Sequence, residues 1–228
     1  MKILIVAATR MEVKLLIDEF SFVEEKNDFL RQYKFAGSEI DLLITGIGTT
    51  FTTFRLTQTL AENNYNLVLN MGIAGSLTRE LNIGEIVNVV SEEFADLGIE
   101  KQDEFLTLFE AGFMDANDYP FENGTLKATA GIELAGLKKV RGITTNKSHG
   151  RKQSIAEVHQ KFSAHVESME GAAVFYVCNS MGVPCNQIRA ISNFVEPRDS
   201  SKWNIPLALE NLKEAIIAVL KKLSVPVN

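Results

Sequence analysis

Short apolar runs alternate with helical patterns along the whole chain. A continuous apolar run, typical of a strand covered on both faces, occupies residues 2–8, and residues 65–76, 84–91, 140–146 and 184–192 also have strand character. Helical spacing of apolar positions marks residues 11–20, 51–64, 154–162 and 205–223. The segment 168–182 is apolar on nearly all sides, which predicts a helix buried in the core. This alternation predicts an α/β fold.

Two further segments complete the pattern. Residues 33–46 predict a hairpin with its turn at Gly37-Ser38. Residues 92–137 are the least periodic part and predict loops and variable insertions. No repeat, low-complexity linker or Pro/Gly-rich boundary interrupts the 228 residues. We therefore expect one domain spanning residues 1–228, long enough for a sizeable core.

Composition and charge exclude several classes of function. The net charge is −6, the pI is about 5.2, and no basic run of five residues occurs, which argues against a nucleic-acid binder. No apolar run reaches the 18 residues of a membrane span. Cys178 and Cys185 are too few for a disulfide framework and predict reduced core thiols in a cytoplasmic protein. His149, His159 and His165 lack metal-ligand spacing, so neither a metal nor another cofactor is expected.

Glycine-bearing strand ends are the first candidates for a ligand site. "TGIGTT" (45–50), "NMGIAGS" (70–76, with Gly72 and Ile73) and the end of "RAIS" at 192 fall where open α/β sheets bind ligands. Glycine lets the backbone approach a ligand and offer N–H groups. Tight strand-to-helix turns explain these glycines equally well, and no third glycine completes a dinucleotide fingerprint.

Two acidic residues are more informative. Glu12 follows the first strand, near the start of the first helix, and Glu170 lies at the start of the apolar helix. A carboxylate at the head of a buried helix is stabilised by the helix dipole. A solvated first-turn acid at Glu12 and simple capping by Glu170 remain alternatives.

Taken together, the segments resemble a known family. "MKILIVAATRMEV", "TGIGTT", "NMGIAGS", "VESMEGAAVFYVC" and "RAISNFVEPRD" resemble, in order and spacing, the landmarks of the nucleoside phosphorylase/nucleosidase superfamily. The resemblance covers nearly the whole chain and is weakest from about 92 to 137. It implies a single-domain mixed central sheet flanked by helices. "ESMEGAA" and "SNFVEPRD…W" look most like futalosine hydrolases, which release hypoxanthine from futalosine in menaquinone biosynthesis.

The resemblance also implies roles in N-glycosidic bond cleavage. Glu12 matches the general base that activates water. Met169 and Glu170 match the pair under the ribose, where a carboxylate favours the oxocarbenium-like transition state. Arg189 matches an arginine that steadies the acids, although an ordinary ion pair explains it equally well. Members of this superfamily associate through apolar surfaces, so a homodimer or larger homo-oligomer is expected.

The residue at position 193 directs the substrate prediction. Adenine-specific nucleosidases carry an aspartic acid where this chain has Asn193. An amide donates permanently, and its NH2 suits N7 and a 6-oxo group, both acceptors. Arg198 could then pair with the benzoate of futalosine and Trp203 could lie against its ring. A structured loop with an Arg198 surface ion pair is the alternative.

Three other functions remain open at this stage. A methylthioadenosine/S-adenosylhomocysteine nucleosidase is disfavoured by Asn193. A 6-oxopurine nucleoside phosphorylase would need a cationic phosphate pocket, to which Arg10 and Arg55 could contribute, but Glu12 would repel phosphate. A non-catalytic nucleoside-binding or storage protein would have no need of Glu12 as a base.

Overall fold

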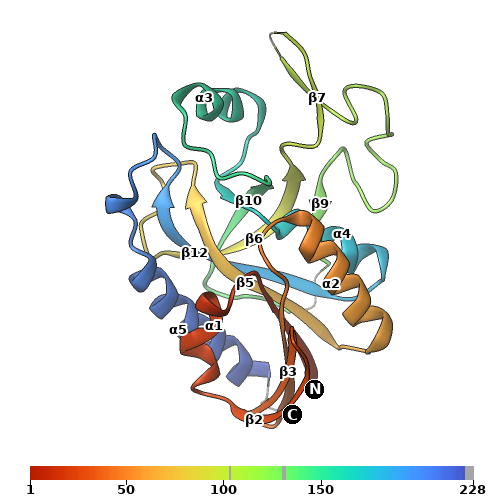
Figure 1. Cartoon of the computed structure of the whole chain (residues 1–228), viewed down its shortest axis with the longest axis vertical. Helices are drawn as coiled ribbons and strands as arrows, with labels where there is room; N and C mark the ends of the chain where they lie inside the picture. Colours follow the sequence, from red (N-terminus) through yellow and green to blue (C-terminus); the bar gives the residue numbers. More distant parts are fainter. Residues whose placement is uncertain (103, 130–131, 224–228) are drawn as a thin grey trace.

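A mixed sheet forms the centre of the molecule (Figure 1). The computed structural model describes residues 1–102, 104–129 and 132–223, so eight positions of the predicted domain 1–228 lie outside the described residues. Its strands are β1 (Lys2–Ala7), β2 (Ser21–Asn27), β3 (Leu30–Phe35), β4 (Ser38–Ile44), β5 (Leu67–Ser76), β6 (Ile86–Phe94), β7 (Gly98–Glu100), β8 (Phe105–Thr107), β9 (Leu126–Lys127), β10 (Lys138–Thr144), β11 (Val166–Ser168) and β12 (Cys185–Phe194). Its helices are α1 (Arg10–Ile17), α2 (Thr49–Glu62), α3 (Lys152–Lys161), α4 (Gly171–Ser180) and α5 (Ile205–Leu223), with a 3-10 turn at Ser200–Lys202.

The strand order brings distant segments together at one edge. The main sheet runs β11-β10-β6-β12-β5-β1-β4-β3-β2, with β9 beside β6. β5 lies parallel to β1 and β12, while β12 is antiparallel to β6. β11 pairs with both β10 and β5, so that β5, β12, β6, β10 and β11 close into a ring. The carboxyl ends of β1, β5 and β12 therefore lie next to one another.

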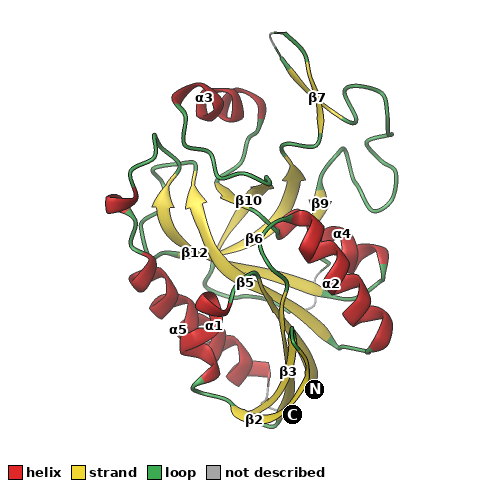
Figure 2. Ribbon diagram, viewed as in Figure 1, coloured by secondary structure: helices red, strands yellow, loops and turns green. Residues whose placement is uncertain are grey.

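Helices cover the sheet on two sides (Figure 2). α1 and α5 pack together on one side, and α5 contacts β5 and β12. α2 and α4 pack together on the other side, where α4 contacts β10. α4 is buried on nearly all sides, as its sequence predicts. No helix of the described residues is long and apolar enough to cross a membrane.

The predicted mixed α/β architecture is confirmed, and four local predictions are corrected. β2 was not predicted because its residues are almost all exposed and show no buried face. Residues 92–137 are not only loops: β6 continues to Phe94, and β7, β8 and β9 follow. The apolar helix begins at Gly171 rather than at residue 168, because β11 occupies Val166–Ser168. β12 runs to Phe194, which pairs with Ser76 of β5, so Asn193 belongs to the strand instead of following it.

Candidate active site

A cavity of about 330 Å³ opens at the carboxyl ends of β1, β5 and β12. Seven of the nine predicted site residues line it, whereas Gly72 and Arg189 do not. The full lining is Ala8, Thr9, Met11, Glu12, Ile47, Ile73, Ala74, Gly75, Ser148, Glu167, Ser168, Met169, Glu170, Ser192, Asn193, Val195, Arg198 and Trp203.

Glu12 is a buried carboxylate held from both sides. It forms a capping box with Thr9, whose backbone N–H and hydroxyl donate to Oε2 at 2.9 and 3.0 Å. The N–H of Ile73 donates to Oε1 at 3.2 Å. Only 7% of Glu12 is exposed, which rules out the solvated first-turn acid. The Ile73 N–H, expected to face the ligand, is thus used to orient Glu12.

Glu170 is the N-cap residue of α4 and has two partners. Its Oε1 accepts from the Gly48 N–H at 3.0 Å, and its Oε2 lies 3.9 Å from Nη1 of Arg189. Burial raises the pKa of Glu170, while Arg189 and the Gly48 N–H act in the opposite direction. The nearby Glu12 raises this pKa further, so the two acids are electrostatically linked.

Arg189 is a buried cation behind the cavity wall. It is 1% exposed, and its Nε and Nη2 have no hydrogen-bond partner among the described residues. A buried cation with unpaired donors is costly, but it offsets the charges of the acids around it. The absence of a side chain at Gly72 leaves room for Arg189 and Glu12. A Cβ there would lie 2.4 Å from Nη1 of Arg189 and 2.6 Å from Oε1 of Glu12.

The amide of Asn193 has a fixed orientation. Its Nδ2 donates to the carbonyl of Phe194 at 3.0 Å, and its Oδ1 accepts from the hydroxyl of Ser192 at 2.8 Å. Because a backbone carbonyl can only accept, the NH2 end must face Phe194. One N–H of Nδ2 is then left for a ligand, rather than both as the sequence suggested.

Arg198 and Trp203 meet at the rim of the cavity. The guanidinium carbon lies 5.1 Å from the centre of the Trp203 ring. The surface ion pair expected as the alternative is absent from the described residues, because Glu196 instead binds Arg79 and Lys202. The exposed Arg198 guanidinium therefore lies beside an aromatic ring at the cavity mouth.

Comparison with known proteins identifies the family. The model of the phosphorylase superfamily matches residues 2–221. The chain belongs to this superfamily. A futalosine hydrolase from Acidothermus cellulolyticus is 32% identical over 78% of this chain and 74% of its own length. A 5'-methylthioadenosine/S-adenosylhomocysteine nucleosidase from Haemophilus ducreyi is 30% identical over 98% of this chain and 99% of its own length.

Solved structures of the superfamily share the fold. The native structure of futalosine hydrolase of Helicobacter pylori superposes with a TM-score of 0.79 at 20% identity, covering 98% of both chains. A nucleosidase of the same organism, solved with butyl-thio-DADMe-Immucillin-A, gives a TM-score of 0.81 at 20% identity, covering 97% of this chain and 98% of its own.

Two buried acids of this superfamily member were missed by the sequence reasoning. Glu167 lines the cavity and was overlooked because it lies two residues before Met169, next to the predicted pair Met169 and Glu170. Glu92 lies fully buried, where the apolar pattern of β6 ends and a loop was predicted. Neither follows a glycine-bearing strand end, so no sequence signal separated them from ordinary surface acids.

Glu92 lies beneath the start of α4. It accepts hydrogen bonds from Gln187 at 2.8 Å and from Thr144 at 3.0 Å. Burial raises its pKa to about 7, although Gln187, Arg189 and Thr144 lower it. A Cβ at Gly171 would lie 2.1 Å from its Oε1, so the glycine that begins α4 admits this carboxyl group.

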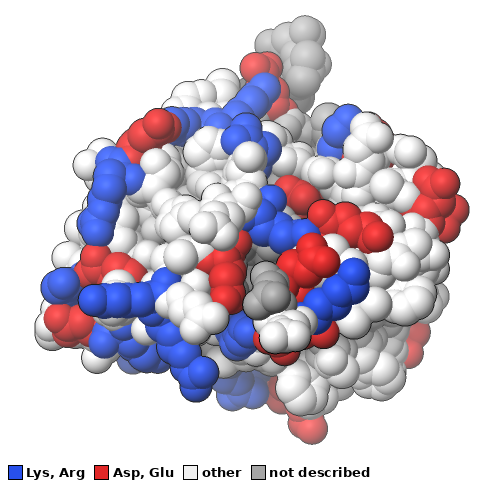
Figure 3. Space-filling view, turned by 90° about the horizontal axis from the view of Figure 1, so that it is seen from above, with Lys and Arg blue, Asp and Glu red and all other residues white. Residues whose placement is uncertain are grey.

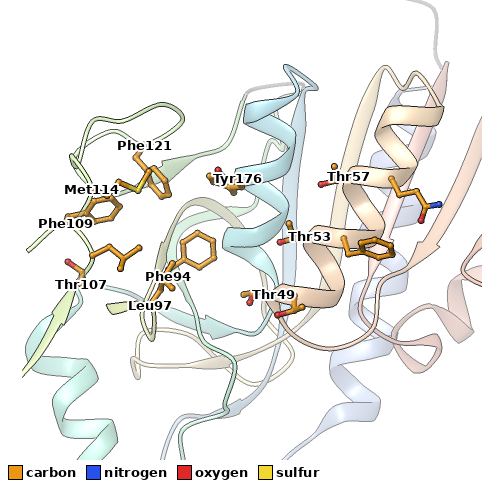
Figure 4. A pocket seen from close by; sticks show the side chains of 14 residues that line it. Thr49, Thr53, Thr57, Phe94, Leu97, Thr107, Phe109, Met114, Phe121 and Tyr176 are labelled. Atoms are coloured by element: carbon orange, nitrogen blue, oxygen red, sulfur yellow. The ribbon is translucent and has the colours of Figure 1, made fainter. Parts of the chain in front are cut away.

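An apolar groove of about 800 Å³ lies beside the candidate active-site cavity. Thr49, Thr53 and Thr57 of α2 form one wall, and aromatic and aliphatic side chains stand opposite (Figure 4). Phe54, which also lines it, is 69% exposed. Thr49, which lines the groove, directly follows Gly48, whose N–H donates to Glu170 of the cavity. A wide apolar surface thus adjoins the site.

Proposed function

We propose that this protein hydrolyses the N-glycosidic bond of futalosine, releasing hypoxanthine and dehypoxanthinyl futalosine in menaquinone biosynthesis. The observation that carries the proposal is the fixed amide of Asn193 in a cavity with the carboxylates of Glu12 and Glu170. Futalosine hydrolases and methylthioadenosine/S-adenosylhomocysteine nucleosidases are similar to this chain at nearly equal identity. Asn193, rather than overall similarity, therefore supports futalosine over methylthioadenosine as the substrate.

The amide suits a 6-oxopurine. N7 and O6 of hypoxanthine are neighbouring acceptors, and the remaining N–H of Asn193 can serve that edge. Negative charge that develops on the departing base spreads onto these two atoms, so the hydrogen bond strengthens in the transition state. In adenine the same edge combines an acceptor with a 6-amino donor, which an N–H opposes.

The two carboxylates would divide the remaining chemistry. Glu12 is oriented by Thr9 and Ile73 and retains lone pairs to accept a proton from the attacking water. Glu170, with Met169, would bind the ribose hydroxyls, and its negative charge would stabilise the cationic ribose. Arg189 would keep Glu170 ionised by opposing the pKa increase that burial causes.

Water is favoured over phosphate as the nucleophile. Neither arginine considered for a phosphate pocket lines the cavity. Arg55 donates to the Thr45 carbonyl at 2.7 Å and stacks 3.4 Å from the centre of the Phe29 ring. Arg10 reaches the Asp28 carbonyl at 3.4 Å. A phosphate would also face the carboxylate of Glu12.

The far end of futalosine would meet the rim residues. The benzoate carboxylate would pair with the Arg198 guanidinium, and its ring would pack against Trp203. This pairing would favour a substrate with an acid at the 5′ end over a plain nucleoside.

A homo-oligomer in the cytoplasm completes the proposal. The groove beside α2 and the exposed Phe51 and Phe54 form an apolar surface suited to a second copy of the chain. Figure 3 shows basic and acidic side chains interspersed over the face seen from above, which supports neither nucleic acid nor a membrane surface as a partner. Cys178 and Cys185 are buried free thiols.

The test offers the purified protein futalosine, methylthioadenosine and inosine, each with and without phosphate, and follows the free base by chromatography. Hypoxanthine should appear from futalosine at the same rate in both buffers. Adenine release without hypoxanthine would favour the methylthioadenosine alternative, which the Haemophilus ducreyi relative supports. A requirement for phosphate would exclude a hydrolase.

A further inference from the structure

Glu167 is a buried acid of the cavity wall that the proposed reaction does not use. Its side chain is 4% exposed and lines the cavity. Oε1 accepts from the backbone N–H of His149 at 3.0 Å, and Oε2 accepts from Nδ1 of His149 at 2.5 Å. Each carboxylate oxygen has two lone pairs, so each can accept one more hydrogen bond.

Glu167 and Asn193 stand on opposite sides of the same glycine. Gly75 of β5 is paired with Glu167 of β11 and with Asn193 of β12. Residues directly opposite on neighbouring strands project from the same face of a sheet, and two strand spacings separate them by about 10 Å. A Cβ at Gly75 would lie 2.8 Å from Val195 and 3.3 Å from Nδ2 of Asn193.

This arrangement leaves a space for a flat base between two polar side chains, Asn193 at one end and Glu167 at the other. The spacing admits one ring system hydrogen-bonded on both sides at about 2.9 Å. One end offers the N–H of Asn193, and the other offers only acceptors, because a carboxylate has no hydrogen to donate. The His149 N–H, a donor that could serve an acceptor on the base, is already bonded to Oε1.

The two ends match the two edges of a 6-oxopurine. N7 and N1 lie on either side of the substituent at position 6. In hypoxanthine N1 carries a hydrogen, whereas in adenine N1 has a lone pair. We propose that Glu167 accepts a hydrogen bond from N1–H of the purine and thereby selects 6-oxopurines over 6-aminopurines, with His149 as its positioning residue. This inference rests on the proposed function for the location of the base.

The test measures the affinity of the free bases hypoxanthine and 1-methylhypoxanthine by calorimetry. The wild-type protein should bind hypoxanthine about 10- to 100-fold more tightly, because methylation removes the donor to a charged acceptor. In Glu167→Ala the ratio should fall to about one, through weaker hypoxanthine binding. His149→Asn retains the carboxylate and should keep a ratio above one while weakening both bases.

Glu157→Ala is the matched control. It removes a carboxylate from the exposed face of α3, outside the cavity, and should leave the ratio unchanged. An unchanged ratio in Glu167→Ala would overturn the inference. If that variant does not fold, the wild type decides: equal affinity for the two bases would exclude the N1 contact, and a tenfold preference for hypoxanthine would support it.

Free-base binding also separates this inference from the substrate proposal. If futalosine is not hydrolysed but the N1 hydrogen controls binding, the substrate proposal fails and the role of Glu167 stands. If futalosine is hydrolysed and N1 methylation has no effect, the role of Glu167 fails and the substrate proposal stands.

Discussion

Asn193 presents the same hydrogen-bonding pattern at every pH, because an amide does not titrate and both of its ends are bonded. An aspartate there would set one carboxylate oxygen against the Phe194 carbonyl, in a position only 9% exposed. Burial and the facing carbonyl would raise the pKa of the new carboxyl group. Its protonated form could donate to N7 while its other oxygen accepts from a 6-amino group.

Asn193→Asp should therefore shift the preference toward a 6-aminopurine. We expect the ratio of kcat/KM for futalosine to that for its 6-amino analogue to fall at least about tenfold, since one hydrogen-bond pair is inverted. The rate should also become dependent on pH, because the new carboxyl group titrates and the amide does not. A variant with an unchanged preference for futalosine would show that Asn193 does not read the purine edge.

Glu92 makes the free energy of unfolding depend on pH. Its pKa is raised by burial from 4.5 to about 7. The folded protein then holds this proton to a higher pH than the unfolded chain does. The free energy of unfolding therefore falls as the pH rises from about 4.5 to 7, by about 3 kcal/mol for this group.

Glu92→Gln should remove that loss, because the amide stays neutral. Urea unfolding of the wild type and the variant at pH 5 and pH 8 measures the effect. Between these pH values the variant should gain about 3 kcal/mol relative to the wild type. Parallel behaviour of the two proteins would mean that Glu92 is ionised throughout this range.

Site residues could be predicted from the sequence where they lie at the junction of a strand and a helix, but not where their position depends on contacts between distant strands. Glu12 and Glu170 follow strands and open helices, so their positions were visible in the sequence. The place of Glu167 in the cavity wall was not predicted, because it depends on the pairing of Glu167 with Gly75. These two residues are 92 positions apart in the chain. Such closure of a sheet into a ring leaves no periodic signal.

At the scale of the elements, β5 organises the site. Its Gly72 leaves room for Glu12 and Arg189, and its Gly75 separates Asn193 from Glu167. β5 and β12 were predicted as buried strands from their short apolar runs, although Asn70, Gln187 and Arg189 interrupt these runs. β2 and the short strands after residue 94 could not be, since exposed or two- and three-residue strands carry no pattern.

Gly72→Ala should damage catalysis more than folding. The added Cβ would lie 2.4 Å from Arg189 and 2.6 Å from Glu12, so both must move. Displacing a base by about 1 Å can cost roughly 100-fold in rate, and we expect a loss of kcat/KM of that order. Gly182→Ala is the control: it adds strain at a positive φ, at a residue that does not line the cavity, and should lower Tm but leave kcat/KM unchanged. Full activity in Gly72→Ala would contradict the proposed placement of Glu12.

At the scale of the whole molecule, one sheet joins the two ends of the described chain. β1 and β12 both pair with β5, and α1 packs on α5. This supports the expected single domain. The apolar groove beside α2 is a surface on which a second copy of the chain could pack.

Phe54→Glu should shift a homo-oligomer toward monomers. Phe54 is 69% exposed in the groove, and a charge there would be buried against apolar side chains on association. Light scattering after size exclusion measures the mass. Phe22→Glu is a matched control, because Phe22 is 60% exposed on β2, away from the groove. A wild-type monomer, or equal masses for the wild type and the Phe54 variant, would contradict this interface.

The central claim is that the cavity selects a 6-oxopurine nucleoside for hydrolysis. The most direct test is the ratio of kcat/KM for futalosine to that for its 6-amino analogue, measured on the wild-type protein without phosphate. The predicted result is hypoxanthine release with a preference for futalosine of at least about 100-fold, as expected for a site that pairs with the 6-oxo edge. Equal rates, or faster cleavage of the 6-amino analogue, would contradict it.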